Sequence, residues 1–121
     1  MSSFASVRVF SLPREALLTR LRQIIARLRA ERPEVLEVRL FGSLARGDAT
    51  AFSDGDLLIL TQADAETVPI QRILRYLPYF DLDRGVDILV FTAAEWQARL
   101  DQGAPFAQTL MRESLRLIEP A

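Results

Sequence analysis

The clearest fold signal in the sequence lies between residues 41 and 60, which read FGSLARGDATAFSDGDLLIL. The stretch ends in a continuous apolar run, residues 57 to 60, directly behind two acidic residues. An apolar run of this length predicts a central strand that is covered on both faces. The pattern recurs at residues 86 to 91, where only Asp87 interrupts the apolar residues, and it predicts a second such strand.

Helical and extended patterns surround these two strands. Apolar residues recur at helical spacing over residues 17 to 28, and Pro33 ends that helix. Residues 35 to 41 alternate between apolar and polar, which predicts a half-buried strand with Leu36 on its buried face. Residues 7 to 10 fit either a short edge strand or an ordered arm.

Three more helices are expected in the second half of the chain. The first covers about residues 67 to 77 and turns Ile70 and Leu74 inward. The next follows a capping-box pattern at Thr92, and the last runs from residue 105 to 118 with a wide apolar face. The order α, β, β, α, β, α, α predicts a small α/β (α+β) domain with a mixed sheet and flanking helices, spanning 1–121 as one unit.

Composition removes several classes of chemistry. Cysteine, histidine and lysine are all absent. Disulfide scaffolds, zinc sites built from Cys and His, histidine bases and phosphate loops that need a lysine are therefore excluded. Any metal must be a hard ion held by oxygen ligands. The net charge of -1 disfavours nucleic acid as a direct ligand, and without a long apolar segment or a signal-like start we expect a cytoplasmic protein.

Three aspartates form the candidate catalytic and metal-binding set. Asp54 and Asp56 stand two residues apart at a strand, so they project from the same face, where their charges repel unless a cation is shared. Asp87 would be costly if buried without a partner, and it reaches the same place if the two apolar strands are neighbours. Asp81 and Asp83 are the alternatives for this third acid. Three carboxylates on adjacent strands suit two Mg²⁺ ions about 4 Å apart.

A candidate phosphate-binding turn precedes these acids. Gly42 allows the backbone to approach a phosphate closely, and the Ser43 hydroxyl can donate to a phosphate oxygen. Arg46 is a candidate clamp on a phosphate or an acceptor, although a surface ion pair with Asp48 explains it equally well.

In this order and spacing, the segments 42–48 and 53–58 resemble the signature of the minimal nucleotidyltransferases, within the polymerase-beta-like superfamily. The resemblance implies the nucleotidyltransferase fold and transfer of a nucleoside monophosphate from ATP or another nucleoside triphosphate to a hydroxyl. It implies nucleotide binding by Gly42 and Ser43, and two Mg²⁺ ions, with Mn²⁺ as a substitute, on the three aspartates. Gly55 and Phe52 depart from the family pattern. Gly55 leaves room for the nucleotide, and Phe52 either stacks on a base or packs in the core.

The same resemblance suggests a partner. Minimal nucleotidyltransferases are often paired with small helical HEPN-type proteins, as antitoxin with toxin, and attach AMP to a tyrosine hydroxyl of that partner. The short sequence favours an acceptor pocket supplied by another chain, either such a partner or a second copy in a homo-oligomer. Two alternatives stay open: a non-catalytic module that binds a nucleotide or a partner, and a dimeric enzyme that modifies a small molecule such as an antibiotic.

Overall fold

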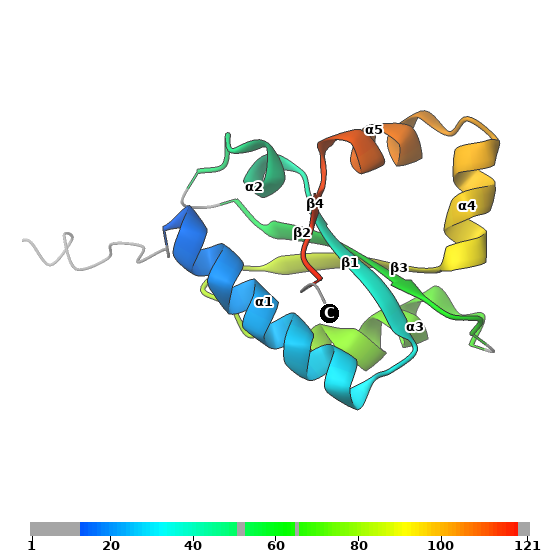
Figure 1. Ribbon diagram of the computed structural model, residues 1–121, viewed down its shortest axis with the longest axis horizontal. Coiled ribbons are helices and arrows are strands. Elements are labelled where there is room, and N and C mark those ends of the chain that lie inside the picture. Colours follow the sequence, from blue (N-terminus) through cyan, green and yellow to red (C-terminus); the bar gives the residue numbers. More distant parts are fainter. Residues whose placement is uncertain (1–12, 51–52, 65, 119–121) are drawn as a thin grey trace, which may run out of the picture.

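The computed structural model describes residues 13–50, 53–64 and 66–118 (Figure 1). Its strands pair in the order β3-β2-β1-β4, with β1 antiparallel to both β2 and β4, and β2 parallel to β3. The helices are α1 (Arg14–Glu31), α2 (Ser43–Arg46), α3 (Pro69–Tyr76), α4 (Ala93–Asp101) and α5 (Pro105–Glu113), with a 3-10 turn, η2, at Leu77–Tyr79. The strands are β1 (Val35–Phe41), β2 (Gly55–Thr61), β3 (Val86–Thr92) and β4 (Leu115–Arg116). The predicted mixed sheet with flanking helices is confirmed.

Helices cover the sheet on both sides. One face packs against α1 and α3 and holds the larger core, to which β2 contributes Leu57 and Ile59. The other face packs against α4 and α5, around Trp96, and receives Leu58 and Leu60 of the same strand. Successive residues of a strand point to opposite faces, which explains why β2 is apolar from Leu57 to Leu60. Figure 1 shows α1 and α3 on one side of the strands and α4 and α5 on the other.

Local signals set several helix ends as expected. The capping box is present at α4, where the Thr92 hydroxyl accepts from the Glu95 amide and the Glu95 carboxylate accepts from the Thr92 amide. Gly103, with φ of 73°, follows that helix, and Pro105 is the first residue of α5. In the described part of the chain, no helix combines the length and the apolar character that a membrane crossing requires.

Three expectations about packing or helix ends were wrong, and a fourth concerns residues that the structure does not describe. Leu36 is 39% exposed, because the register shifts between Val35 and Glu37 and this bulge breaks the alternation. Ile70 and Leu74 are 53% and 55% exposed, because α3 buries Arg72 and Tyr76 instead. The last helix ends at Glu113, and the chain then pairs with β1 as β4. Residues 7 to 10 lie outside the described residues.

Candidate active site

The register of the sheet brings the three predicted aspartates to one end of one face. In the parallel pair of β2 and β3, Asp56 lies directly beside Asp87. Asp54 is the residue before β2, two positions from Asp56, and therefore on the same face. This is the face that α4 and α5 cover further along the strands, where Leu58 follows Asp56. Residues 33 positions apart in the chain thus meet at the start of the two central strands.

Two glycines lie against these carboxylates and leave no room for a side chain of their own. A Cβ atom at Gly42 would overlap Oδ2 of Asp56, and Gly42 also has a φ of 74° that disfavours any other residue. A Cβ at Gly85 would lie 2.8 Å from Oδ1 of Asp54, although Gly85 has no positive φ. Sequence reasoning identified Gly42 and missed Gly85. A glycine directly before a strand that carries an acid is the signal that could have found it.

The electrostatics show that the acids lie close together. The pKa of Asp56 is raised by burial, and further by the negative charges of Asp87 and Asp54, while the positive charge of Arg46 opposes the shift. Within the described residues, no arginine forms an ion pair with any of the three carboxylates. Among the residues that the structure describes, the three carboxylates therefore form a cluster of like charge that no ion pair neutralises.

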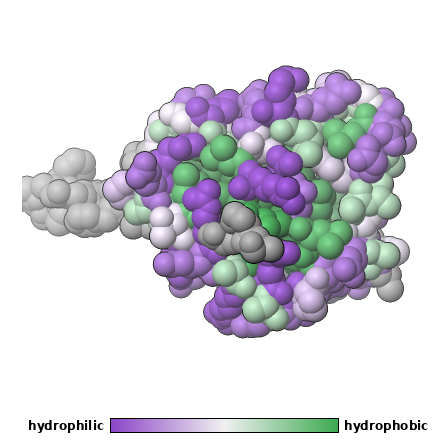
Figure 2. Space-filling view, in the orientation of Figure 1, coloured by the Kyte–Doolittle hydropathy of each residue, from purple (hydrophilic) through white to green (hydrophobic). Residues whose placement is uncertain are grey.

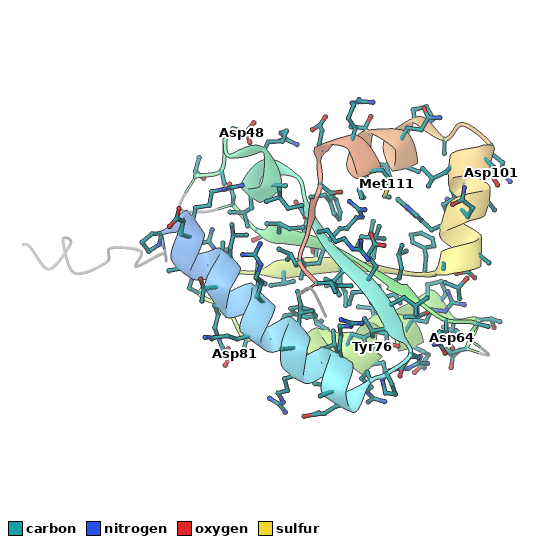
Figure 3. The ribbon with its side chains drawn as sticks, in the orientation of Figure 1. Asp48, Asp64, Tyr76, Asp81, Asp101 and Met111 are labelled. Carbon is teal, nitrogen blue, oxygen red and sulfur yellow. The ribbon has the colours of Figure 1, made fainter. Side chains whose placement is uncertain are left out.

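One premise about the third acid was wrong. Asp87 is exposed at the start of β3, although Ile88 and Val90 of the same strand are buried, so burial cost is not a reason for it to bind a cation. Its place in the cluster follows from the register alone. Of the two alternatives, Asp83 forms an ion pair with Arg84, 2.9 Å between Oδ1 and Nε. Asp81 lies at the lower edge of the molecule in Figure 3, on the opposite side from Asp48 and α2.

The candidate phosphate-binding turn closes the same end of the sheet. β1 ends at Phe41, opposite Asp56, and α2 begins at Ser43 with Gly42 as its cap. Among the described residues the Ser43 hydroxyl makes no hydrogen bond, which leaves it available to a ligand. Arg46 pairs with Asp48 through a 3.2 Å contact and approaches Glu113 of α5 at 3.8 Å. The structure therefore shows the ion pair for Arg46 and places it within electrostatic reach of Asp56.

The donor set suits a hard divalent ion, although the side chains do not converge on one position. Of the described residues, no three His, Cys, Asp or Glu side chains are arranged so that they could hold a metal ion together. The oxygen-only chemistry and the like charge of Asp54, Asp56 and Asp87 fit Mg²⁺ or Mn²⁺.

The two departures from the family pattern have different outcomes. A Cβ at Gly55 would point to the opposite face, 3.7 Å from Cδ1 of Leu44, so the missing side chain leaves its space to α2 and not to the acidic cluster. Phe52 lies outside the described residues.

The chain matches the nucleotidyltransferase domain family over residues 21–108. It belongs to this family. A Sulfolobus solfataricus crystal structure, described as a candidate nucleotidyltransferase, is similar with a TM-score of 0.60 and 19% identity over 85% of this chain and 80% of that one. A crystal structure of a toxin-antitoxin with AMP-PNP gives a TM-score of 0.47 and 18% identity over 82% of this chain and 73% of the other. No curated protein matches this chain.

The family assignment confirms two predictions. The mixed sheet with its flanking helices is the nucleotidyltransferase fold, which the Sulfolobus structure shares. The chain is a nucleotidyltransferase, as its resemblance to the minimal members of the superfamily implies.

Proposed function

We propose that this nucleotidyltransferase moves AMP from ATP to a hydroxyl group on a partner protein. The observation that carries the proposal is the register of β2 and β3, which sets Asp56 beside Asp87 with Asp54 two residues upstream. Phosphoryl chemistry needs concentrated negative charge that can hold divalent ions against a triphosphate. The choice of AMP rests on the resemblance to minimal nucleotidyltransferases.

In the proposed reaction, the acceptor hydroxyl oxygen attacks the α-phosphorus of the triphosphate. An oxygen–phosphorus bond forms, and the bond from the α-phosphorus to the oxygen that bridges to the β-phosphate breaks. Pyrophosphate leaves with the electron pair of that bond. The hydroxyl proton passes to the carboxylate of Asp87, the exposed acid on the edge strand.

Asp54 and Asp56 would hold two Mg²⁺ ions, and Asp87 would hold the one nearer the acceptor. Bound there, the ions would neutralise the triphosphate and lower the pKa of the attacking hydroxyl. The chain's own residues position the substrate. Gly42 keeps the turn close to Asp56, so a phosphate can approach the backbone without meeting a side chain.

Ser43 and Arg46 complete the proposed phosphate site. The Ser43 hydroxyl donates to a phosphate oxygen, and Arg46 exchanges its exposed partner Asp48 for the triphosphate. Such an exchange costs little, because an exposed ion pair of this kind contributes about 0–1 kcal/mol.

The acceptor is proposed to lie on a small helical protein of the HEPN type, with a tyrosine hydroxyl as the attacking group. Two of the three acids, Asp54 and Asp87, are exposed, so a second molecule can reach them. The pairing with a HEPN-type toxin rests on the resemblance to minimal nucleotidyltransferases.

The test is to incubate the purified protein with Mg²⁺, ATP and the protein encoded beside it, and to measure intact masses. We expect the neighbour to gain one adenylyl group with wild type. Asn variants of Asp54, Asp56 and Asp87 should each lose this transfer. Asp81→Asn is the matched control, because it removes an exposed carboxylate six residues before Asp87 and should transfer normally.

Three results would contradict the proposal. Full transfer by Asp54→Asn and Asp56→Asn would show that these two aspartates are not needed for the reaction. Loss of transfer in Asp81→Asn with full activity in Asp87→Asn would show that Asp81, and not Asp87, is the third acid. Metal-dependent ATP binding without transfer to the neighbour, to a second copy or to an antibiotic would instead indicate a non-catalytic binding module.

A further inference from the structure

An aromatic pair, the half-buried Phe41 and the exposed Phe106, borders the acidic cluster. Phe41, the last residue of β1, lies opposite Asp56 in the antiparallel register, and its side chain belongs to the same face of the sheet. The ring of Phe106 on α5 meets it edge to face, with 6.0 Å between centroids and an interplanar angle of 85°. Phe106 is 57% exposed, the highest value among the exposed large hydrophobic residues described. An aromatic ring with that much free surface is available to a ligand.

The orientation of α5 places this ring on the side of the candidate site. Phe106 and Glu113 are seven residues apart, about two helical turns, and so lie on one face of the helix. Glu113 reaches toward Arg46 of α2, with 3.8 Å between Oε1 and Nη1. The face of α5 that carries Phe106 therefore looks toward the end of β1 and the turn that follows it. Met111, by contrast, packs against the second core cluster, and Figure 3 shows it pointing from α5 toward the sheet.

The same face of the sheet changes from charged to apolar within one side-chain step. Leu58 follows Asp56 on β2, and Leu89 follows Asp87 on β3, each two residues along and on the same face. Figure 2 shows hydrophobic residues reaching the surface in the corner between α4 and α5. A nucleoside triphosphate has a matching arrangement of groups. Its phosphate end is anionic and needs cations, and its flat base at the other end has an apolar face.

We propose that Phe106, supported by Phe41, is the stacking platform for the base of the nucleoside triphosphate. The inference rests on the proposed function, because it assigns the phosphate end of the ligand to the acidic cluster. Every base has a π-face, so an aromatic ring can stack on any of them. Stacking alone does not distinguish bases by their hydrogen-bonding groups. Purines, which offer the larger face, should bind more tightly than pyrimidines.

The test compares a ligand that has a base with one that lacks it. Dissociation constants for Mg²⁺–ATP and for Mg²⁺–tripolyphosphate are measured by calorimetry with wild type, Phe106→Ala and Phe106→Tyr. Loss of one stacked base is expected to weaken ATP binding by about 5- to 150-fold in Phe106→Ala. Tripolyphosphate should bind the same variant as it binds wild type, and Phe106→Tyr should keep the ATP affinity. Leu74→Ala is the control, since Leu74 is equally exposed but lies on α3, across the sheet.

The outcomes separate this inference from the proposed function. Unchanged ATP affinity in Phe106→Ala, or equal losses for ATP and tripolyphosphate, would overturn the stacking role alone. Unchanged ATP affinity with slower transfer would also overturn it, because the ring would then serve the acceptor. Failure of wild type to bind either ligand in the presence of Mg²⁺ would overturn both proposals.

Discussion

Replacing Gly85 by alanine should weaken the acidic cluster without weakening the fold. The new Cβ would lie 2.8 Å from Oδ1 of Asp54, whereas ordinary contacts begin at 3.4 Å, so the carboxylate must retreat by about 0.6 Å. Gly85 has no positive φ, and the atom that moves is the end of an exposed side chain. The substitution therefore costs little free energy of unfolding. In a catalytic group, however, displacements near 1 Å reduce rates by about 100-fold, so we expect a loss of about tenfold in kcat.

The matched control is Gly55→Ala, the other glycine near the start of β2. Its Cβ would point to the opposite face and meet Cδ1 of Leu44 at 3.7 Å, an ordinary contact. Replacing a glycine that has no positive φ should stabilise the protein by about 0.4–1 kcal/mol, because the unfolded chain loses conformational freedom, and should leave kcat unchanged. Transfer is measured by intact mass over time. Unfolding by urea is followed through Trp96, the single tryptophan, which is buried beside Phe91.

Two results would refute this reasoning. Normal kcat in Gly85→Ala would show that the position of the Asp54 carboxylate is unimportant for transfer. A loss of activity that is matched by a loss of unfolding free energy would show that the variant acts through the fold. The reasoning requires a fall in rate in Gly85→Ala at unchanged stability, together with an unaffected Gly55→Ala protein.

Three further predictions concern charge and backbone. Burial and like charges raise the pKa of Asp56 above the ordinary value of 3.8. In metal-free buffer, the free energy of unfolding should therefore fall as the pH rises above 3.8. Asp56→Asn should melt at a higher temperature than wild type at pH 7 and at the same temperature below pH 3.8. Gly42→Ala should abolish transfer and lower the free energy of unfolding by about 1–3 kcal/mol in a urea titration. Gly47→Ala is the control, because Gly47 also has a positive φ but no atom lies within 4 Å of its Cβ position. It should lower the free energy of unfolding by about 1 kcal/mol and retain transfer. Arg72→Ala should lose about 1–3 kcal/mol by urea titration, because the buried Arg72 guanidinium bonds to Glu95 and to the Glu66 carbonyl. Arg27→Ala, in a fully exposed pair, should leave the urea midpoint almost unchanged.

The elements that alternation or helical spacing marks strongly were predictable from the sequence. The apolar run at β2 predicted a strand buried on both faces, which the structure confirms. The run at β3 correctly predicted a strand, but β3 lies at the edge of the sheet and is fully buried on one face only. The capping box at Thr92 fixes the start of α4 through two local hydrogen bonds. In each case the deciding interactions lie within a few residues of one another.

Tertiary packing decided what the sequence pattern could not. On α3, buried Arg72 forms two hydrogen bonds with Glu95 of α4, and Tyr76 donates to Glu34. These long-range partners turn the helix so that Ile70 faces outward, against the apolar pattern. The burial of Asp87 was likewise misjudged, because an apolar run does not show that Asp87 lies exposed at the start of the strand.

The two ends of the parallel pair of β2 and β3 differ in how their charges are balanced, and this difference supports the proposed position of the active site. At the carboxyl ends, a cavity of about 490 Å³ is lined by acids that arginines neutralise: Arg75 lies 2.8 Å from Asp64, and Arg72 lies 2.6 Å from Glu95. At the amino ends, the charges of Asp54 and Asp87 act on Asp56, and no arginine of the described residues forms an ion pair with any of the three. Because β1 runs antiparallel to β2, its carboxyl end delivers the Gly42 turn to this second end. Among the described residues no arginine forms an ion pair with these acids, and this is the charge arrangement that the proposed divalent-cation site requires.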